Sequence, residues 1–273
     1  MKKNSYIFLG WIDDPKNALV VKKLKQIFSD NHLEENHLDP QYAFVLGGDG
    51  TFLKSFHKYH QIGLKLIGIN SGTLGFYTFA NAKELVNNPS KFDVIFNDNN
   101  FIHPYAIKIT LFDEHQNIIN EYFALNDVVI QTIFTLKAKI MVNDSNNLFL
   151  NYEGSGIILS TPSGSTAINM SNGSVLYFSY IPAMCLSFIL PINNHKFHNL
   201  RNNVLFNHEQ VLYFQLAKNI DYQIAFDGVL IPTEELNKTK VFKCILQPSN
   251  CFIFLPTDPR SCKERIDKFI SQK

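Results

Sequence analysis

The first hundred residues alternate between short apolar runs and segments with apolar residues at helical spacing. Runs rich in β-branched and aromatic residues predict strands, whereas apolar positions three and four residues apart predict helices. Repeated strand and helix units are typical of a doubly wound, Rossmann-like α/β domain, in which ligands bind at the carboxyl ends of the strands. The predicted strands are Ser5–Trp11, Tyr42–Leu46 and Leu66–Ile69, and the predicted helices are Pro15–Ser29 with Asp14 as its cap, Thr51–Tyr59 and Ala82–Asn87.

The pattern changes near residue 100, where short strands begin to follow one another directly. Turn residues such as Asn143-Asp144 and Asp227-Gly228 separate several of them, which is typical of a β-rich, sandwich-like domain. The last residues, Pro259–Lys273, have the apolar spacing of a terminal helix. The predicted strands of this part are Tyr105–Leu111, Asn120–Ala124, Val128–Gln131, Lys137–Val142, Gly156–Ser160, Val211–Leu216, Gln223–Phe226 and Val241–Leu246.

Composition narrows the class of protein. The chain has 273 residues, 45% of them hydrophobic and 18% charged, which suffices for two domains with apolar cores. The formal net charge is only +1, so no nucleic-acid partner is expected. Four cysteines without a C-x-x-C pair favour reduced thiols and a cytoplasmic location. The apolar run Ile181–Leu190 is too short to cross a bilayer, so no membrane partner is expected.

A glycine-rich loop follows the predicted strand Tyr42–Leu46 and precedes a predicted helix. In such a unit, backbone N–H groups and the helix dipole point toward an anion, which is commonly a phosphate. Gly47, Gly48 and Gly50 permit a tight turn and close approach of a ligand. Asp49 among them either accepts a proton from an attacking hydroxyl, or holds a ribose or a metal ion, or simply caps the helix.

Several motifs in order identify a family resemblance. The segment GGDGTFL at 47–53 is similar to a loop shared by NAD kinases, 6-phosphofructokinases and diacylglycerol-type lipid kinases. The later segments INSGTLGFYT, ALNDVVI, GIILSTPSGSTAINMS and AFDGVL, together spanning about residues 69 to 230, resemble motifs of NAD kinases alone. The chain therefore resembles the NAD kinase family, of the short bacterial type.

This resemblance implies a domain organisation and an activity. It implies an α/β domain over 1–100, a β-rich nucleotide-binding domain over 101–255, and a terminal segment 256–273 that returns to the first domain. The implied reaction transfers the γ-phosphoryl group of ATP to the 2′-hydroxyl of the adenosine ribose of NAD, giving NADP. Mg²⁺ or another divalent metal would be bound mainly through the nucleotide phosphates. Homodimers or homotetramers are also implied.

The resemblance assigns roles to individual residues. Asp49 would act as the general base, and Phe76 and Tyr77 would pack on the adenine, unless they are ordinary core aromatics. Asn126 and Asp127 would bind sugar hydroxyls, unless they only form an Asx turn. No residue is expected to ligate a metal directly. The expected nucleotide-binding residues are Gly48, Gly50, Thr51, Phe76, Tyr77, Asn126, Asp127, Ser155, Ser163, Thr166, Ala167, Ile168, Ser171 and Asp227.

Two of these motifs also have a purely structural explanation. Ser163 or Ser165 would serve equally as a helix cap. The pair Asp227-Gly228 is also a common hairpin turn.

The sequence departs from the family pattern at four positions. Ser155 stands where the family usually has an Asp, Glu153 where an Arg or a similar side chain is common, Ile168 where a Tyr is common, and Asn172 where a Gly is common. These departures motivate an alternative function, a catalytically weak sensor that binds NAD or NADP. The shared Gly-Gly-Asp-Gly loop leaves a diacylglycerol-type lipid kinase as a further alternative.

Overall fold

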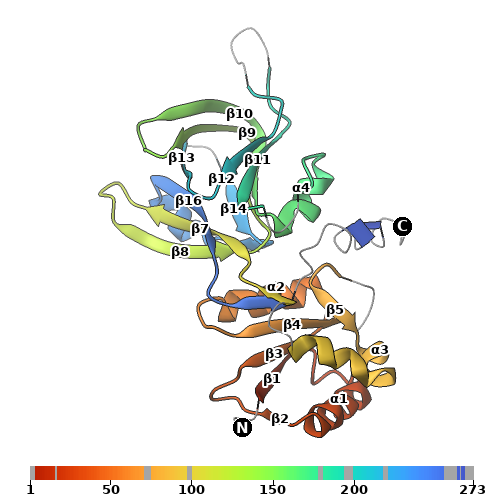
Figure 1. Cartoon of the computed structure of the whole chain (residues 1–273). Coiled ribbons are helices and arrows are strands. Elements are labelled where there is room, and N and C mark those ends of the chain that lie inside the picture. The colour runs from red at the N-terminus through yellow and green to blue at the C-terminus, as the bar shows by residue number, and fades with distance from the viewer. Residues whose placement is uncertain are drawn as a thin grey trace. The chain divides into compact units, whose positions relative to one another are not determined.

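A computed structural model describes residues 4–15, 17–70, 75–96, 100–177, 181–193, 199–217 and 221–254, together with residues 263, 264, 266 and 267. The chain divides into two compact units, the first formed by Met1–Pro104 with Ser249–Lys273 and the second by Tyr105–Pro248 (Figure 1). The second unit is thus inserted between two parts of the first. The expected terminal helix Pro259–Lys273 lies almost entirely outside the described residues.

The first unit is built on a seven-stranded sheet in the order β2-β1-β3-β4-β17-β6, with β5 also paired to β4. All its pairs are parallel except β17 with β6. Its strands are β1 (Asn4–Gly10), β2 (Leu33–Glu35), β3 (Tyr42–Leu46), β4 (Lys65–Asn70), β5 (Thr78–Asn81), β6 (Phe101–Ile102) and β17 (Phe252–Phe254), and its helices are α1 (Ala18–Asp30), α2 (Asp49–Tyr59), α3 (Ala82–Asn87) and the 3₁₀ helix η1 (Pro89–Phe96).

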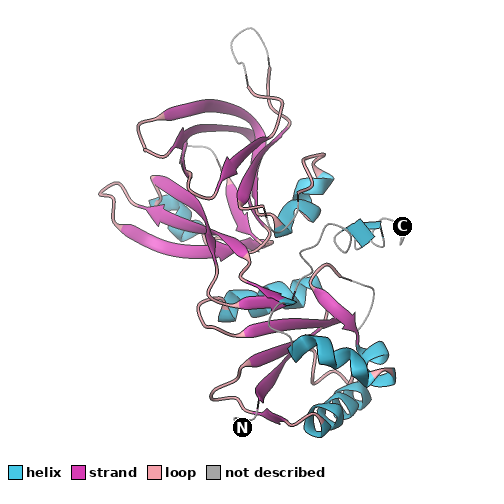
Figure 2. Cartoon of the chain, viewed as in Figure 1, coloured by secondary structure: helices cyan, strands magenta, loops and turns pink. Residues whose placement is uncertain are grey.

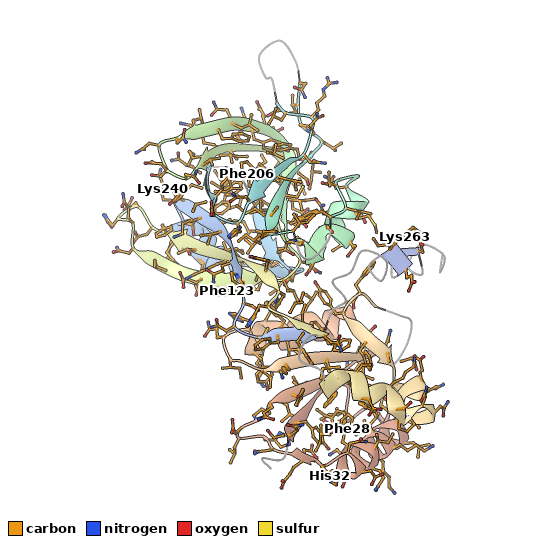
Figure 3. The ribbon with its side chains drawn as sticks, in the orientation of Figure 1. Phe28, His32, Phe123, Phe206, Lys240 and Lys263 are labelled. Atoms are coloured by element: carbon orange, nitrogen blue, oxygen red, sulfur yellow. The ribbon has the colours of Figure 1, made fainter. Side chains whose placement is uncertain are left out.

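Helices cover both faces of this sheet, which confirms the doubly wound α/β class. Every residue of β3 is buried, as a strand between two covered faces requires. One face packs on α1 and α3 through an aromatic cluster in which Phe28 contacts Phe44 at 4.3 Å between ring centroids. Figure 3 marks Phe28 on α1. Helix α2 buries Phe52 and Phe56 and packs on β1, β3 and β4.

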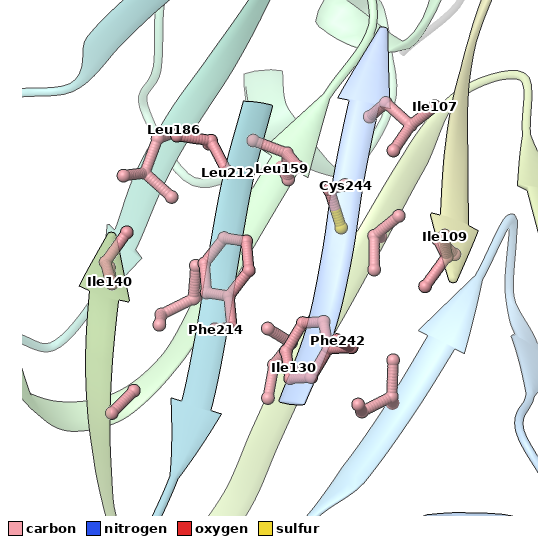
Figure 4. Packing of buried hydrophobic residues seen from close by; sticks show 14 of the residues in the cluster. Ile107, Ile109, Ile130, Ile140, Leu159, Leu186, Leu212, Phe214, Phe242 and Cys244 are labelled. Carbon is pink, nitrogen blue, oxygen red and sulfur yellow. The ribbon is translucent and has the colours of Figure 1, made fainter. Parts of the chain in front are cut away.

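The second unit is a ten-stranded, antiparallel sheet that closes around one apolar core (Figures 2 and 4). It confirms the expected β-rich class, with eight strands in the order β12-β11-β10-β9-β13-β16-β7-β8 and with β14 paired to β9 and to β15. Its strands are β7 (Tyr105–Phe112), β8 (Ile118–Ala124), β9 (Asp127–Val142), β10 (Leu148–Ser160), β11 (Ala183–Ile189), β12 (Val204–Asn207), β13 (Val211–Leu216), β14 (Gln223–Phe226), β15 (Val229–Leu230) and β16 (Val241–Pro248), and its short helices are η3 (Ser163–Thr166), α4 (Ile168–Ser171) and α5 (Thr233–Lys238).

Strand β9 lets the sheet curl around this core. The first half of β9 pairs with β14, and its second half pairs with β13. The full length of β9 lies along β10, with a bulge between Gly154 and Gly156. Phe214 and Phe242 stack at 4.9 Å in the core between neighbouring strands (Figure 4). One long, bulged strand therefore joins the two expected strands Val128–Gln131 and Lys137–Val142.

Three further boundaries differ from the sequence expectations. The first helix begins at Ala18, not at Pro15, and Asn17 precedes it without a side-chain cap. Residues 252–254 were expected in the second domain, but they pair with β4 and so belong to the first unit. The apolar run Ile181–Leu190 contains β11, whose seven residues pair with β10 and β12. No helix in the described part of the chain is long and apolar enough to cross a membrane.

Candidate functional site

The Asp49 carboxylate links the two glycine loops of the first unit. Asp49 is the first residue of α2, and its oxygens accept hydrogen bonds from the N–H groups of Phe76 (2.9 Å) and Tyr77 (3.0 Å). Gly48 occupies the position before the helix, with no side-chain cap. Asp49 is therefore no helix cap, which removes that alternative for this residue. Each carboxylate oxygen keeps a lone pair for a further donor, because a carboxylate accepts about four hydrogen bonds.

The glycines around Asp49 have different reasons to lack a side chain. Gly47 has φ of +156°, and an added Cβ would lie 2.6 Å from the side chain of Thr51. At Gly48 and Gly50, by contrast, an added Cβ would meet no atom within 4 Å in the part of the chain that the structure describes. Internal packing therefore does not demand glycine at those two positions, whereas close approach of a ligand to the backbone would.

Thr51 lies on the protein side of the loop. Its side chain fills the space beside Gly10 and Gly47, where an added Cβ would lie 2.8 Å and 2.6 Å from it. Its hydroxyl is thus positioned by the ends of β1 and β3. Its expected nucleotide contact stays a prediction.

Gly75 is held against Asp49. A Cβ on Gly75 would lie 2.3 Å from an Asp49 oxygen, so only glycine leaves the carboxylate in place. Of the two aromatics that follow, Tyr77 is 3% exposed and stacks on Phe52 with the ring planes 2° apart. Phe76 is half-buried. The Tyr77 ring is therefore a core side chain, and Phe76 is the better candidate for a contact with adenine. The segment Ser71–Leu74 of this motif lies outside the described residues.

In the second unit, the Asn-Asp motif forms a tight segment between β8 and β9, the Leu125–Asp127 turn. The Asp227 carboxylate accepts hydrogen bonds from three successive N–H groups of this turn: Leu125 at 2.7 Å, Asn126 at 2.7 Å and Asp127 at 3.1 Å. Asp227 and Gly228 have φ of +47° and +79°, as in a type I′ hairpin turn between β14 and β15. Asp227 is thus both a turn residue and an anchor for a segment 100 residues away.

The T-P-S-G motif contacts the same turn from another side. The Thr161 hydroxyl donates to Leu125 O at 2.5 Å, and the Thr161 N–H donates to Asn126 O at 2.8 Å. The same hydroxyl accepts from Gly164 N–H at 3.0 Å. A Cβ on Gly164 would lie only 2.0 Å from Asn126 O. Three motifs that are distant in sequence therefore form one hydrogen-bonded cluster.

In the segment after Thr161, side chains that hold the backbone in place by hydrogen bonds alternate with side chains that are accessible to solvent. The Ser165 hydroxyl donates to Tyr177 O at 2.9 Å, and Asn169 is buried within hydrogen-bonding distance of Ser187. Neither Ser163 nor Ser165 caps a helix, because Pro162 precedes η3 and makes no side-chain cap. The expected ligand-binding residues lie on the accessible side: Ser163, Thr166 and Ala167 are partly exposed, and Ile168 and Ser171 are exposed.

Ser155 occupies the bulge of β10, where it has no partner in the β9 ladder. The Tyr152 hydroxyl lies at this irregularity, 2.6 Å from Gly156 O and 2.8 Å from Ile189 O, either of which can accept its single proton, and it accepts the Gly156 N–H at 3.2 Å. Glu153 is buried and forms an ion pair with Lys137 at 3.0 Å. Of the two departures from the family pattern, Ser155 thus lies within one irregularity and Glu153 lies two residues before it. The expected role of Ser155 in binding stays a prediction.

Burial and charge act together on Asp127. Asp127 is 6% exposed. Desolvation and the nearby Asp227 charge together raise the pKa of the Asp127 carboxyl from 3.8 to about 7. Asp127 therefore carries its proton through much of the pH range in which an ordinary aspartate is ionised. A protonated carboxyl is a hydrogen-bond donor as well as an acceptor.

Replacing Asp127 with asparagine is expected to stabilise the protein, and more at pH 8 than at pH 5. A carboxyl whose pKa rises on folding costs stability progressively as pH increases from the unfolded value of 3.8 to the folded value of about 7, and the cost is constant above that. The full penalty is at most about 4 kcal/mol, and asparagine removes it. Urea unfolding at both pH values measures the difference. An equal gain at both would contradict the raised pKa, and the exposed Asp144→Asn is the control.

Sequence reasoning missed Thr161, Gly164, Gly75 and Asn169. Thr161 follows the expected strand Gly156–Ser160 and precedes Pro162, a position where hydroxyl-bearing residues often bond to a nearby backbone N–H. That pattern was a usable signal. The close approach at Gly75 and Gly164 has no local signature, because each glycine faces a segment that is far away in the sequence.

Comparisons with known proteins identify the family of the chain. Residues 17–92 match the family model described as the ATP-NAD kinase N-terminal domain. The chain is 30% identical to NAD kinase 1 of Listeria innocua, over 80% of this chain and 82% of that protein. It is 28% identical to the NAD kinase of Ureaplasma parvum, over 82% and 79% of the two chains.

Two solved structures share the fold. The yeast NADH kinase complexed with NADH superposes with a TM-score of 0.77 at 17% identity, covering 98% of this chain and 87% of that one. An NAD kinase from Archaeoglobus fulgidus in complex with ATP gives a TM-score of 0.71 at 16% identity, covering 97% and 98%. Together with the sequence identity over four-fifths of its length, these findings place the chain in the NAD kinase family.

Proposed function

We propose that this protein phosphorylates NAD at the 2′-hydroxyl of its adenosine ribose, with ATP as the phosphoryl donor, to form NADP. The observation that carries the proposal is the Asp49 carboxylate, fixed by two N–H groups beside two glycines that leave their surroundings open. Relatives named NAD kinase, and structures of such enzymes with ATP or NADH, support the choice of substrates.

Asp49 is proposed as the general base. A ribose hydroxyl is a poor nucleophile at neutral pH, and a positioned base contributes roughly 10²–10⁴-fold to the rate. The two N–H donors fix the direction of the carboxylate, so that its remaining lone pairs face a constant position. Because the transition state of phosphoryl transfer is loose, alignment of the hydroxyl matters at least as much as base strength.

The backbone at Gly48 and Gly50 is proposed to receive the donor phosphates at the start of α2. The helix dipole and the first N–H groups of α2 favour an anion there. Mg²⁺ would accompany the nucleotide phosphates and neutralise their charge. Among the described residues no three His, Cys, Asp or Glu side chains converge.

The Asn126–Asp127 pair is proposed to bind sugar hydroxyls, and the accessible residues Ser163, Thr166, Ala167, Ile168 and Ser171 to line the nucleotide site. The anchors Thr161 and Ser165 fix the backbone that carries them. We further propose a cytoplasmic location, which fits three cysteines that are buried as free thiols.

The decisive experiment incubates the purified protein with NAD, ATP and Mg²⁺ and measures NADP with an NADP-specific dehydrogenase. Time-dependent NADP formation supports the proposal. Folded protein that binds NAD by calorimetry but makes no NADP would favour the sensor instead. A parallel incubation with dispersed diacylglycerol tests the lipid kinase, for which phosphatidic acid would be the product.

Self-association is proposed through an apolar part of β9. Ile133 and Phe134 are 88% and 70% exposed, opposite the bulge at Ser155. Exposed apolar residues that lie together commonly mark an interface. Replacing both with lysine is expected to shift the protein to monomers in size-exclusion chromatography with light scattering, while the melting temperature changes little. A wild-type monomer, or an unchanged oligomer in the variant, would contradict this surface.

A further inference from the structure

The Asp227 carboxylate is used entirely within the protein fold. Both of its oxygens accept backbone N–H groups from the Leu125–Asp127 turn, at 2.7, 2.7 and 3.1 Å. The Asp227 N–H in turn donates to Asp127 O at 3.0 Å. Four hydrogen bonds thus join one hairpin residue to three consecutive residues of another segment. A carboxylate that accepts several N–H groups makes charge-assisted bonds, which are stronger than neutral ones.

We propose that Asp227 is a positioning residue that holds the Asn126–Asp127 pair in the orientation needed to bind the ribose of NAD. The expected effect of Asp227 on NAD binding rests on the proposed function. The hydrogen bonds between Asp227 and the Leu125–Asp127 turn do not depend on it. It replaces the expected direct contact of Asp227 with the nucleotide. Thr161 does not satisfy these three donors, because its hydroxyl and its N–H bond to the carbonyl oxygens of the same turn.

Asparagine is an informative substitution at this position. Asn-Gly is the favoured pair for a type I′ turn, so Asp227→Asn preserves the hairpin between β14 and β15. Its amide nitrogen, however, is a donor and would face an N–H donor of the turn. The substitution therefore removes at least one of the three hydrogen bonds without breaking the turn that carries Asp227.

The charges around the turn predict a second signature. Asp227 is the charged group that faces Asp127 from the β14–β15 turn, and it contributes to the raised pKa of Asp127. The Thr161–Gly164 segment brings no titratable side chain, and β10 places Ser160 opposite Asp127. Removing the Asp227 charge lowers the pKa of Asp127 toward its ordinary value.

The matched control is Asp144→Asn. Asp144 lies in the β9–β10 hairpin turn of the same unit and accepts a backbone N–H from Asn146 at 2.7 Å. The substitution is chemically the same, and Asp144 is exposed and contacts none of the three motifs of the cluster in the described structure. General effects of changing a turn aspartate will appear in both variants.

The first measurement is amide hydrogen exchange, which needs no activity. In the wild type, the N–H groups of Leu125, Asn126 and Asp127 are expected to be protected at least about a hundredfold relative to exposed amides. Asp227→Asn is expected to lower the protection of at least one of these three amides about tenfold or more, because the amide nitrogen cannot accept its N–H, and Asp144→Asn to leave all three unchanged. Exposed-like exchange in the wild type, or unchanged protection in a folded Asp227→Asn, would overturn the proposal.

The second measurement is steady-state kinetics of NADP formation across pH. Asp227→Asn is expected to raise the KM for NAD at least about tenfold, because one or more N–H donors lose their partner and the turn shifts. The pH at which KM changes is expected to move to lower values. An unchanged KM and pH profile would overturn the role in binding. If the wild type made no NADP, the proposed function would fail, whereas the exchange result would still decide whether Asp227 holds the turn.

Discussion

Asp49→Asn is expected to lower kcat for NADP formation at least about a hundredfold, because the amide cannot accept the proton of the attacking hydroxyl. The structure adds a second consequence. The amide nitrogen would face one of the N–H groups of Phe76 and Tyr77 that the carboxylate accepts. The variant thus tests chemistry and loop anchoring together, and the kinetic constants must separate them.

The two roles leave different signatures. Loss of a base acts on the chemical step, so kcat falls while KM for NAD changes little. Loss of an anchor displaces the second glycine loop, so KM rises and kcat is largely kept. A rise in KM with kcat unchanged would therefore refute the role of Asp49 as a base. Asp93→Asn, an exposed aspartate of the same unit, is the control.

Gly75→Ala gives an independent test of the same geometry. Its Cβ would lie 2.3 Å from an Asp49 oxygen and must push the carboxylate aside. The base is then present but misplaced, so kcat is expected to fall although every titratable group remains. Gly63→Ala is the matched control, because an added Cβ there would meet nothing within 4 Å among the described residues.

Gly164→Ala is expected to have the second-largest effect, on stability and on binding together. Its Cβ would lie 2.0 Å from Asn126 O and 2.4 Å from Asn126 C, and both are backbone atoms that cannot rotate away. Overpacking of this kind typically costs about 1–3 kcal/mol. Because the displaced segment is the Leu125–Asp127 turn, the KM for NAD is expected to rise about tenfold or more.

Thermal unfolding and steady-state kinetics of Gly164→Ala measure the two effects. Gly63→Ala is again the control, and its melting temperature and KM are expected to stay near the wild-type values. Gly164 does not have a positive φ, so backbone strain is not a competing explanation. A wild-type melting temperature and KM in Gly164→Ala would show that the two segments do not approach as closely as the structure has them.

The helices and strands that were predicted best from the sequence are those that a local residue pattern determines. Tyr42–Leu46, Ala82–Asn87, Val211–Leu216 and Gln223–Phe226 were predicted with the bounds that the structure has. An unbroken apolar run or a clear spacing is decisive when both neighbours are turn residues. The first half of β10 was missed because the polar residues Asn151 and Glu153 interrupt the apolar run. Strand β17 was missed because three residues carry too little pattern.

The motifs named candidate site residues but did not indicate which groups those residues contact. The motifs indicated Asp49, Asn126, Asp127 and Asp227, but not that two of these carboxylates bind backbone N–H groups. Those bonds join residues 27 and about 100 positions apart, so no local pattern encodes them. Likewise, the Tyr77 ring stacks on Phe52 in the core because α2 brings Phe52 there. Chemistry can be predicted from residue types, whereas the partner of a side chain depends on the tertiary fold.

The pairing of β17 with β4 has a consequence for the order of events on the ribosome. The chain is made from its N-terminus, and domains tend to fold as they emerge. Strand β17 emerges only after the entire second unit, so until then the Lys65–Leu66 edge of β4 lacks its partner. An unpaired strand edge can associate with other chains. The inserted unit can therefore complete its own fold first, while the unit that carries Asp49 is finished last.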